Sequence, residues 1–252
     1  AYNLCGLLQF SFHGVSNVAQ IKLISRGLEA LAGNVSTEVE FKDNGTIGTA
    51  NSTFVANTQT GIVNYVPASG TMAENTNYFV VLPTGKLASG LTLVFILTDG
   101  KSLQVKLNDA VNIERAKRYD LGNIALNASK AKVEILSNKG LIESVKLQIR
   151  DLEINPDGTL DIYKGNNLEK ILSLKGNLNI AYNDNITSLD GLQYFRNVTD
   201  LNIYGNKNLA GNIDLSKYKQ LTGSVEIQRC PAVTKVDATG LDIKTLKVHD
   251  MD

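Results

Sequence analysis

The sequence predicts an all-β chain, with an N-terminal antiparallel β-sandwich over residues 1–126 and a C-terminal parallel β-solenoid over residues 127–252. Two observations support this prediction. In the first 126 residues, short segments of alternating apolar and polar residues are separated by Gly, Asn, Asp and Pro, as in strands with one buried face. The last third repeats one short apolar pattern at nearly constant spacing, which is typical of a solenoid.

Five segments of the first block show the strand pattern most clearly. The last two flank Asp99 and Gly100, and because Asp-Gly favours the positive φ angles of a tight turn, we expect these two segments to pair antiparallel. Short strands with frequent turn residues indicate a sandwich. A helix is expected in this block only at residues 25–31. The five segments are 8–12, 21–23, 39–41, 91–97 and 103–107.

The beginning of the second block reads as a junction followed by capping strands. Residues 127–131 lack an apolar pattern, and strand-like segments follow at 133–135, 145–149 and 152–154. The terminal coil of a solenoid exposes an apolar edge unless something covers it. We therefore expect strands within about 127–165 to cap the solenoid.

Four copies of the repeated pattern begin at Leu178, Leu201, Val225 and Leu246, so successive starts lie 23, 24 and 21 residues apart. Each copy reads apolar, any residue, apolar, any two residues, and the first three then end in Asn or Cys, which resembles the consensus of leucine-rich repeats. We expect every copy to form one strand, stacked in parallel on the next, with its two apolar side chains inward. The segment 160–168 resembles a divergent first coil.

The polar residue that ends a copy has a structural role in this prediction. Asn183 and Asn206 end the first two copies, and Cys230 takes the same place in the third. An amide turned inward can bond the backbone groups left free where the chain leaves the sheet, and each such group costs about 1 to 3 kcal/mol when it is buried unpaired.

The residues between and after the inward positions point outward and form the candidate ligand-binding surface. Stacked strands align them in columns at about 5 Å spacing. Amides, a tyrosine and mixed charges suit a glycan or a protein partner, although a merely solvated face is the alternative. The first column holds Asn179, Asn202, Glu226 and Lys247, and the second holds Ala181, Tyr204, Gln228 and His249, of which all but Ala181 are candidate ligand-binding residues.

Composition argues against several other classes. The chain has 25 basic and 25 acidic residues and a formal net charge of zero, whereas a nucleic-acid-binding protein normally carries an excess of Lys and Arg. Cys5 and Cys230 fall in different predicted domains, so neither a disulfide nor a metal site is indicated. No apolar run approaches the roughly 20 residues of a membrane-spanning helix.

No catalytic constellation is apparent, and we expect neither an enzyme nor a bound cofactor. His13 and His249 are the only histidines and lie far apart in the sequence. Asp184, Asp190 and Asp200 fall at different repeat positions and read as solvated loop residues. The common phosphate-binding and acyl-transfer motifs are missing.

The first block also resembles the fimbrillin-like (Mfa-like) surface proteins of Bacteroidetes, over roughly residues 1–126. The resemblance lies in the order and spacing of several segments, namely 4–10, 31–33, 78–83, 90–92, 99–100 and 114–122. It implies an exported, often lipid-anchored β-sandwich protein that acts in fimbriae or adhesion. The second half is similar to bacterial leucine-rich-repeat or receptor-L-type modules, in which runs such as 185–192 recur.

Together these features predict a non-enzymatic protein of the cell surface or outer membrane that binds a host or bacterial surface protein or glycan. Strand character begins already at Tyr2 and Leu4, so we expect a trimmed or mature chain whose removed N-terminal segment provided the anchor. A fimbrial accessory or tip subunit, in contact with other fimbrial subunits, is the alternative, because a chain that continues into repeats departs from a shaft subunit. A component of a polysaccharide-processing enzyme is a weaker alternative.

Overall fold

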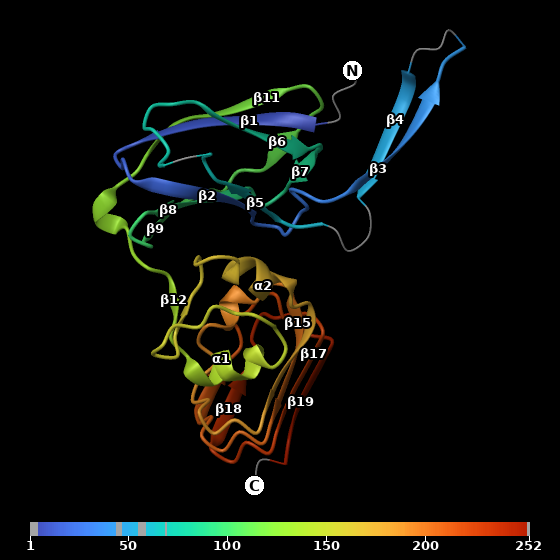
Figure 1. The fold of residues 1–252 in the computed structure, drawn as a ribbon. Coiled ribbons are helices and arrows are strands. Elements are labelled where there is room, and N and C mark those ends of the chain that lie inside the picture. Colours follow the sequence, from blue (N-terminus) through green and yellow to red (C-terminus); the bar gives the residue numbers. More distant parts are fainter. Residues whose placement is uncertain (1–4, 44–46, 55–58, 69, 251–252) are drawn as a thin grey trace. The chain divides into compact units, whose positions relative to one another are not determined.

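The computed structural model describes residues 5–43, 47–54, 59–68 and 70–250, and Tyr2 and Leu4 lie outside them. The chain divides into two compact units, Ala1–Val133 and Glu134–Asp252 (Figure 1). Both consist mainly of strands, and the second contains a β-solenoid of about three turns, which confirms the predicted fold class.

The first unit contains two main sheets, with strand orders β11-β1-β6 and β5-β2-β8-β9. Two further pairs, β3-β4 and β7-β10, are antiparallel. The strands are β1 (Cys5–His13), β2 (Val18–Ser25), β3 (Val35–Phe41), β4 (Ile47–Phe54), β5 (Ile62–Tyr65), β6 (Tyr78–Pro83), β7 (Gly85–Leu87), β8 (Leu91–Leu97), β9 (Ser102–Leu107), β10 (Val111–Ile113) and β11 (Arg118–Ala125), and a 3-10 helix, η1, spans Ala128–Lys130.

Alternating apolar residues of β1, β2 and β8 form the core of this unit. Phe10 and Phe12 of β1 are fully buried, and the ring of Phe12 meets that of Phe95 of β8 edge to face at 5.4 Å between centroids. Leu23 of β2 belongs to the same cluster. The side chains that the alternating pattern assigned to one buried face therefore do pack together.

The pairing of these strands confirms one prediction and corrects two. The strands β8 and β9 form the expected antiparallel hairpin. However, β1 pairs in parallel with β11, which is possible because the rest of the unit supplies the long connection that a parallel pair needs. The predicted helix at 25–31 is wrong, because its backbone bonds go to other segments: Arg26 N–H donates to Gly90 O, and Leu31 N–H donates to Thr60 O.

The second unit is a solenoid with two parallel sheets, ordered β14-β15-β17-β19 and β16-β18. The strands β15, β17 and β19 are seen stacked beside one another in Figure 1. The elements are β12 (Ile135–Leu136), α1 (Lys139–Lys146), β13 (Leu160–Asp161), α2 (Asn167–Ser173), β14 (Gly176–Ala181), η2 (Leu192–Tyr194), β15 (Val198–Tyr204), β16 (Gly211–Asp214), β17 (Ser224–Gln228), β18 (Val233–Asp237) and β19 (Thr245–His249).

The register of the four-stranded sheet confirms the repeat prediction. Leu178 pairs with Leu201, Leu201 with Val225, and Val225 with Leu246. The first three of these side chains are at most 1% exposed. Each strand thus buries its apolar pair against the next coil, as the nearest-neighbour stacking of repeat proteins requires.

The inward asparagines also act as predicted. Asn206 is fully buried. Its Nδ2 donates to Ile180 O at 2.8 Å, and its Oδ1 accepts from Asn183 N–H at 2.9 Å. Cys230 occupies the same position in the following coil, is buried, and its Sγ lies 3.4 Å from Gln228 O. Asn206 therefore joins two successive coils beneath the sheet, whereas the Cys230 contact stays within its own coil.

The expected capping strand at 145–149 is wrong, because these residues belong to α1 and the turn that follows it. Asn138 caps this helix, with its Oδ1 accepting from Leu141 N–H at 3.1 Å, a favoured N-cap interaction. Leu141, Ile142 and Val145 lie at helical spacing and are buried, whereas Leu147 is 87% exposed. Period-two alternation in so short a run did not distinguish a strand from a helix.

The helix nevertheless covers the first edge of the solenoid, as a cap should. Gln148 Nε2 donates to Asn179 O at 2.8 Å, and Asn179 N–H donates to Gln148 Oε1 at 3.1 Å. Asn183 Nδ2 reaches back to Gly140 O at 2.7 Å. One glutamine amide thus pairs with both backbone groups of Asn179 at the edge of β14, where a further strand would otherwise bond.

The segment 160–168 is not a coil of the parallel sheet. The turn at Asn155–Thr159, closed by the Asn155 N–H to Thr159 O bond, leads into β13, which pairs antiparallel with β12. Residues 167–173 then form α2. Gly165 stands where a repeat has its asparagine, and glycine lacks the amide that would bond the next coil.

Candidate ligand-binding face

The seven candidate residues lie together on the outward side of the sheet β14-β15-β17-β19, here called the outer face. Direct pairing places Asn179 beside Asn202, Asn202 beside Glu226, and Glu226 beside Lys247. The second column is aligned in the same way, with Tyr204 beside Gln228 and Gln228 beside His249. All seven side chains are exposed or half-buried. They therefore form one continuous polar surface.

His249 of this face is paired with two carboxylates. His249 Nε2 lies 3.1 Å from Glu226 Oε1, and His249 Nδ1 lies 3.2 Å from Asp250 Oδ2. Hydrogen bonds to the side chains of Glu226 and then Asp250 raise the pKa of His249 above its usual value, because each carboxylate favours the imidazolium. The C-terminal part of the face therefore carries a histidine held between two carboxylates.

A further column, which the sequence analysis did not identify, follows directly after the strands. Its members occupy the fifth position of each copy, which in the first three copies directly precedes the inward Asn or Cys. All have left-handed backbone conformations: Tyr182 with φ 51°, Gly205 with φ 66°, Arg229 with φ 52° and Asp250 with φ 52°. Tyr182 N–H donates to Tyr204 O at 2.8 Å, and Arg229 N–H donates to Asp250 O at 2.9 Å. The sheet bonding thus continues through this left-handed position.

Three side chains gather where this left-handed column meets the second outward column. The rings of Tyr182 and Tyr204 lie edge to face, with 4.9 Å between centroids and 73° between planes. The Arg229 guanidinium lies 5.2 Å from the centroid of the Tyr204 ring, within the range of a cation–π contact. Tyr182 is 72% exposed. An open aromatic ring therefore borders the outer face.

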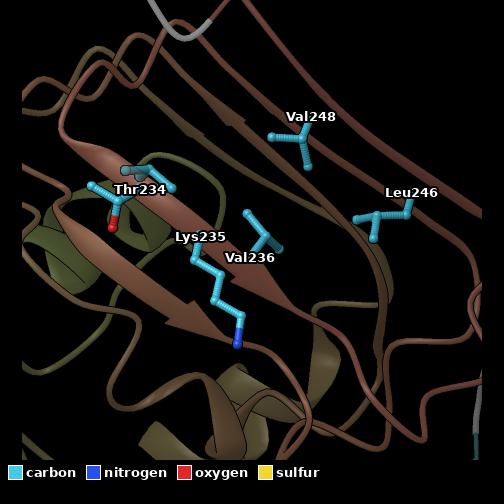
Figure 2. A pocket seen from close by; sticks show the side chains of 6 residues that line it. Thr234, Lys235, Val236, Leu246 and Val248 are labelled. Atoms are coloured by element: carbon cyan, nitrogen blue, oxygen red, sulfur yellow. The ribbon is translucent and has the colours of Figure 1, made fainter.

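The solenoid also has a hollow on its inner side at the last described coil. Leu246 is 44% exposed and Val248 is 42% exposed, although both occupy inward positions that are buried in the preceding strands. Figure 2 shows Leu246 and Val248 of β19 around a space shared with Val236 of β18. The hollow measures about 380 Å³. It lies at the end of the stack, away from the columns of the outer face.

Other kinds of site are not evident in the part of the chain that the structure describes. There, no three His, Cys, Asp or Glu side chains are grouped so that they could hold a metal ion. Within the same residues, no helix has the length and apolar character needed to cross a membrane.

The solenoid resembles a domain of known family. Residues 158–252 match the family described as the endo-beta-N-acetylglucosaminidase EndoS LRR domain. This range begins just before β13 and includes all four strands of the outer face. The second unit thus contains a leucine-rich-repeat-type domain. A comparison of the chain with curated proteins finds no match.

Proposed function

We propose that this protein is a non-enzymatic binding protein that captures a protein or glycan ligand on its outer face. The supporting observation is the in-register alignment of Asn179, Asn202, Glu226 and Lys247 beside Tyr204, Gln228 and His249. Hydrogen-bonding groups at regular spacing on a rigid sheet are positioned before the ligand arrives, which lowers the entropic cost of binding. Repeat proteins commonly present their binding surfaces in this way.

The proposed setting is the bacterial cell surface, with the first unit presenting the solenoid. This part of the proposal is supported by the resemblance of residues 1–126 to fimbrillin-like proteins. Protease treatment of intact cells of the source organism tests it. A surface location predicts that the protein is digested while a cytoplasmic marker protein survives, and survival of both argues against it.

The binding proposal is tested with glycan and protein arrays. The triple variant Asn202→Ala, Glu226→Ala, Lys247→Ala removes three of the four side chains of the first column of the outer face. A matched control, Lys207→Ala, Asn212→Ala, Asp242→Ala, changes similar residue types at exposed positions outside that column. We expect the first variant to lose capture and the control to retain it, with unchanged circular dichroism in both. Equal capture by both variants would reject this face as the binding site.

One observation favours the alternative role of an accessory or tip subunit in an assembly. The strand β6 is at the edge of the sheet β11-β1-β6, and its Phe79 and Val81 are 46% and 62% exposed. An exposed edge strand can pair with a strand from another chain. Native mass spectrometry with candidate fimbrial subunits tests this alternative, and a mixed complex that Val81→Lys abolishes would support it.

A further inference from the structure

We infer that Tyr182, Tyr204 and Arg229, here called the tyrosine ledge, bind a pyranose ring of an oligosaccharide. The inference rests on the proposed function, because it assigns a ligand class to one border of the outer face. It adds Tyr182 and Arg229, which lie outside the two outward columns, to Tyr204 of the second column, and it gives this border of the face a distinct role.

The backbone of the ledge is the first argument. A left-handed conformation is strained for a residue other than glycine. Gly205 meets this requirement without strain, whereas Tyr182 and Arg229 adopt the same conformation in equivalent coils. The left-handed backbone at this repeat position therefore does not require a large side chain. Large side chains in strained positions are typical of binding sites, where they are kept for their contacts rather than for stability.

The packing of Tyr182 is the second argument. A Cβ atom added to Gly205 would lie 2.8 Å from Cδ1 and 2.9 Å from Cε1 of the Tyr182 ring. The ring therefore rests against the bare backbone of the next coil, and Tyr204 touches it from the side. Although it is exposed, the Tyr182 ring therefore contacts the protein at Gly205 and at Tyr204. A side chain that already has such contacts loses less conformational entropy when a ligand stacks on it.

The surroundings of the ring favour a saccharide over a protein side chain. An aromatic ring attracts the weakly positive C–H groups of a sugar ring to its face, and sugar hydroxyls need donors and acceptors nearby. The neighbouring Gln228 amide and Arg229 guanidinium supply both donors and an acceptor. In the two outward columns only Ala181 is apolar. The residues that dominate binding at protein–protein interfaces lie instead within well-packed, fully desolvated pockets, and so polar a surface does not provide such a pocket.

The charges near the ledge agree with this assignment. The Tyr182 hydroxyl is protonated at neutral pH, since the ordinary pKa of tyrosine is about 10, and a hydrogen bond to the Tyr204 side chain raises the pKa of Tyr182 further. The Arg229 cation lies against the Tyr204 ring. The ledge thus offers an aromatic surface and directed hydrogen bonds, and not a cluster of like charges of the kind that recognises phosphate backbones.

The test uses the full chain labelled with nitrogen-15 and titrated with trisaccharides of glucose, mannose and N-acetylglucosamine at millimolar concentrations. We expect at least one sugar to shift the amide signals of Tyr182, Tyr204 and Arg229 in two-dimensional NMR spectra. Tyr182→Ala should weaken that binding by roughly tenfold or more, whereas Tyr182→Phe should retain most of it because the ring remains. Asn212→Ala, an exposed substitution on the other sheet, should leave it unchanged.

The outcomes separate this inference from the proposed function. No shifts with any of the three sugars, shifts confined to other residues, or equal binding by Tyr182→Ala would overturn the tyrosine ledge as a saccharide site. In that event, capture of a protein ligand that depends on Asn202, Glu226 and Lys247 would still support the proposed function. Loss of saccharide binding in Tyr182→Ala alone, with the first column unchanged, would support the inference.

Discussion

Replacing Asn206 with alanine should destabilise the solenoid far more than the same change at Asn208, two residues away. Asn206 Nδ2 donates to Ile180 O, and its Oδ1 accepts from Asn183 N–H, in a fully buried position. The alanine variant leaves both backbone groups unpaired. At about 1 to 3 kcal/mol for each buried group, the expected loss is about 2 to 6 kcal/mol.

Asn208 provides the matched control. Its Nδ2 also donates to a backbone carbonyl, Asp184 O, at 2.7 Å, but the side chain is exposed. Water can replace that bond, so Asn208→Ala should cost less than about 1 kcal/mol. Urea unfolding followed by far-ultraviolet circular dichroism measures both values, with the slope of the transition checked for constancy. Equal losses of stability in the two variants would refute the role given to the buried Asn206 amide.

Three further predictions concern the core, the cap and the outer face. Leu201→Ala should lower the free energy of unfolding by about 2 to 5 kcal/mol because it leaves a cavity. Leu246→Ala changes a 44% exposed position and should lower it clearly less. Similar losses for the two variants in urea unfolding would contradict the partial exposure of the last described coil. Gly140→Ala should be destabilising by about 1 to 3 kcal/mol, although alanine normally favours a helix, because the new Cβ would lie 2.5 Å from Ile186 N; a higher melting temperature would show the reasoning to be wrong. The pKa of His249 should lie above about 6.5 and fall in Glu226→Gln when followed by NMR. Since the folded pKa is the higher one, the stabilisation from His249 is complete below the unfolded pKa and is lost as pH rises through the folded pKa; an unchanged pKa in Glu226→Gln would exclude this pairing.

The solenoid could be predicted from sequence because its pattern combines two independent constraints. The apolar pair in each copy, such as Leu201 and Ile203, specifies which side chains face inward, and the Asn at a fixed offset specifies where the strand ends. Both recur at nearly the same spacing, so a shift of register would place apolar residues on the outer face. The columns of the candidate site followed directly from that register.

The parts that sequence reasoning missed depend on single turns rather than on repeated patterns. The segment 145–149 alternates like a strand, and only the Asn138 cap and the buried Leu141, Ile142 and Val145 upstream indicate a helix. Tyr182 and Arg229 were missed because strand alternation does not describe the left-handed residue after a strand. Gly205 at the same repeat position was the available signal, since glycine commonly marks a positive φ.

The first and last described coils of the solenoid differ in how their edges are covered. At one end, Gln148 of the capping segment binds the backbone of β14; at the other, the inward side chains of β19 stay partly in contact with solvent. Local fraying is therefore cheapest at β19, and amide hydrogen exchange should slow progressively from β19 through β17 and β15 to β14. Among the described coils, we expect those on the β19 side to unfold first, one at a time, and those nearest α1 to unfold last.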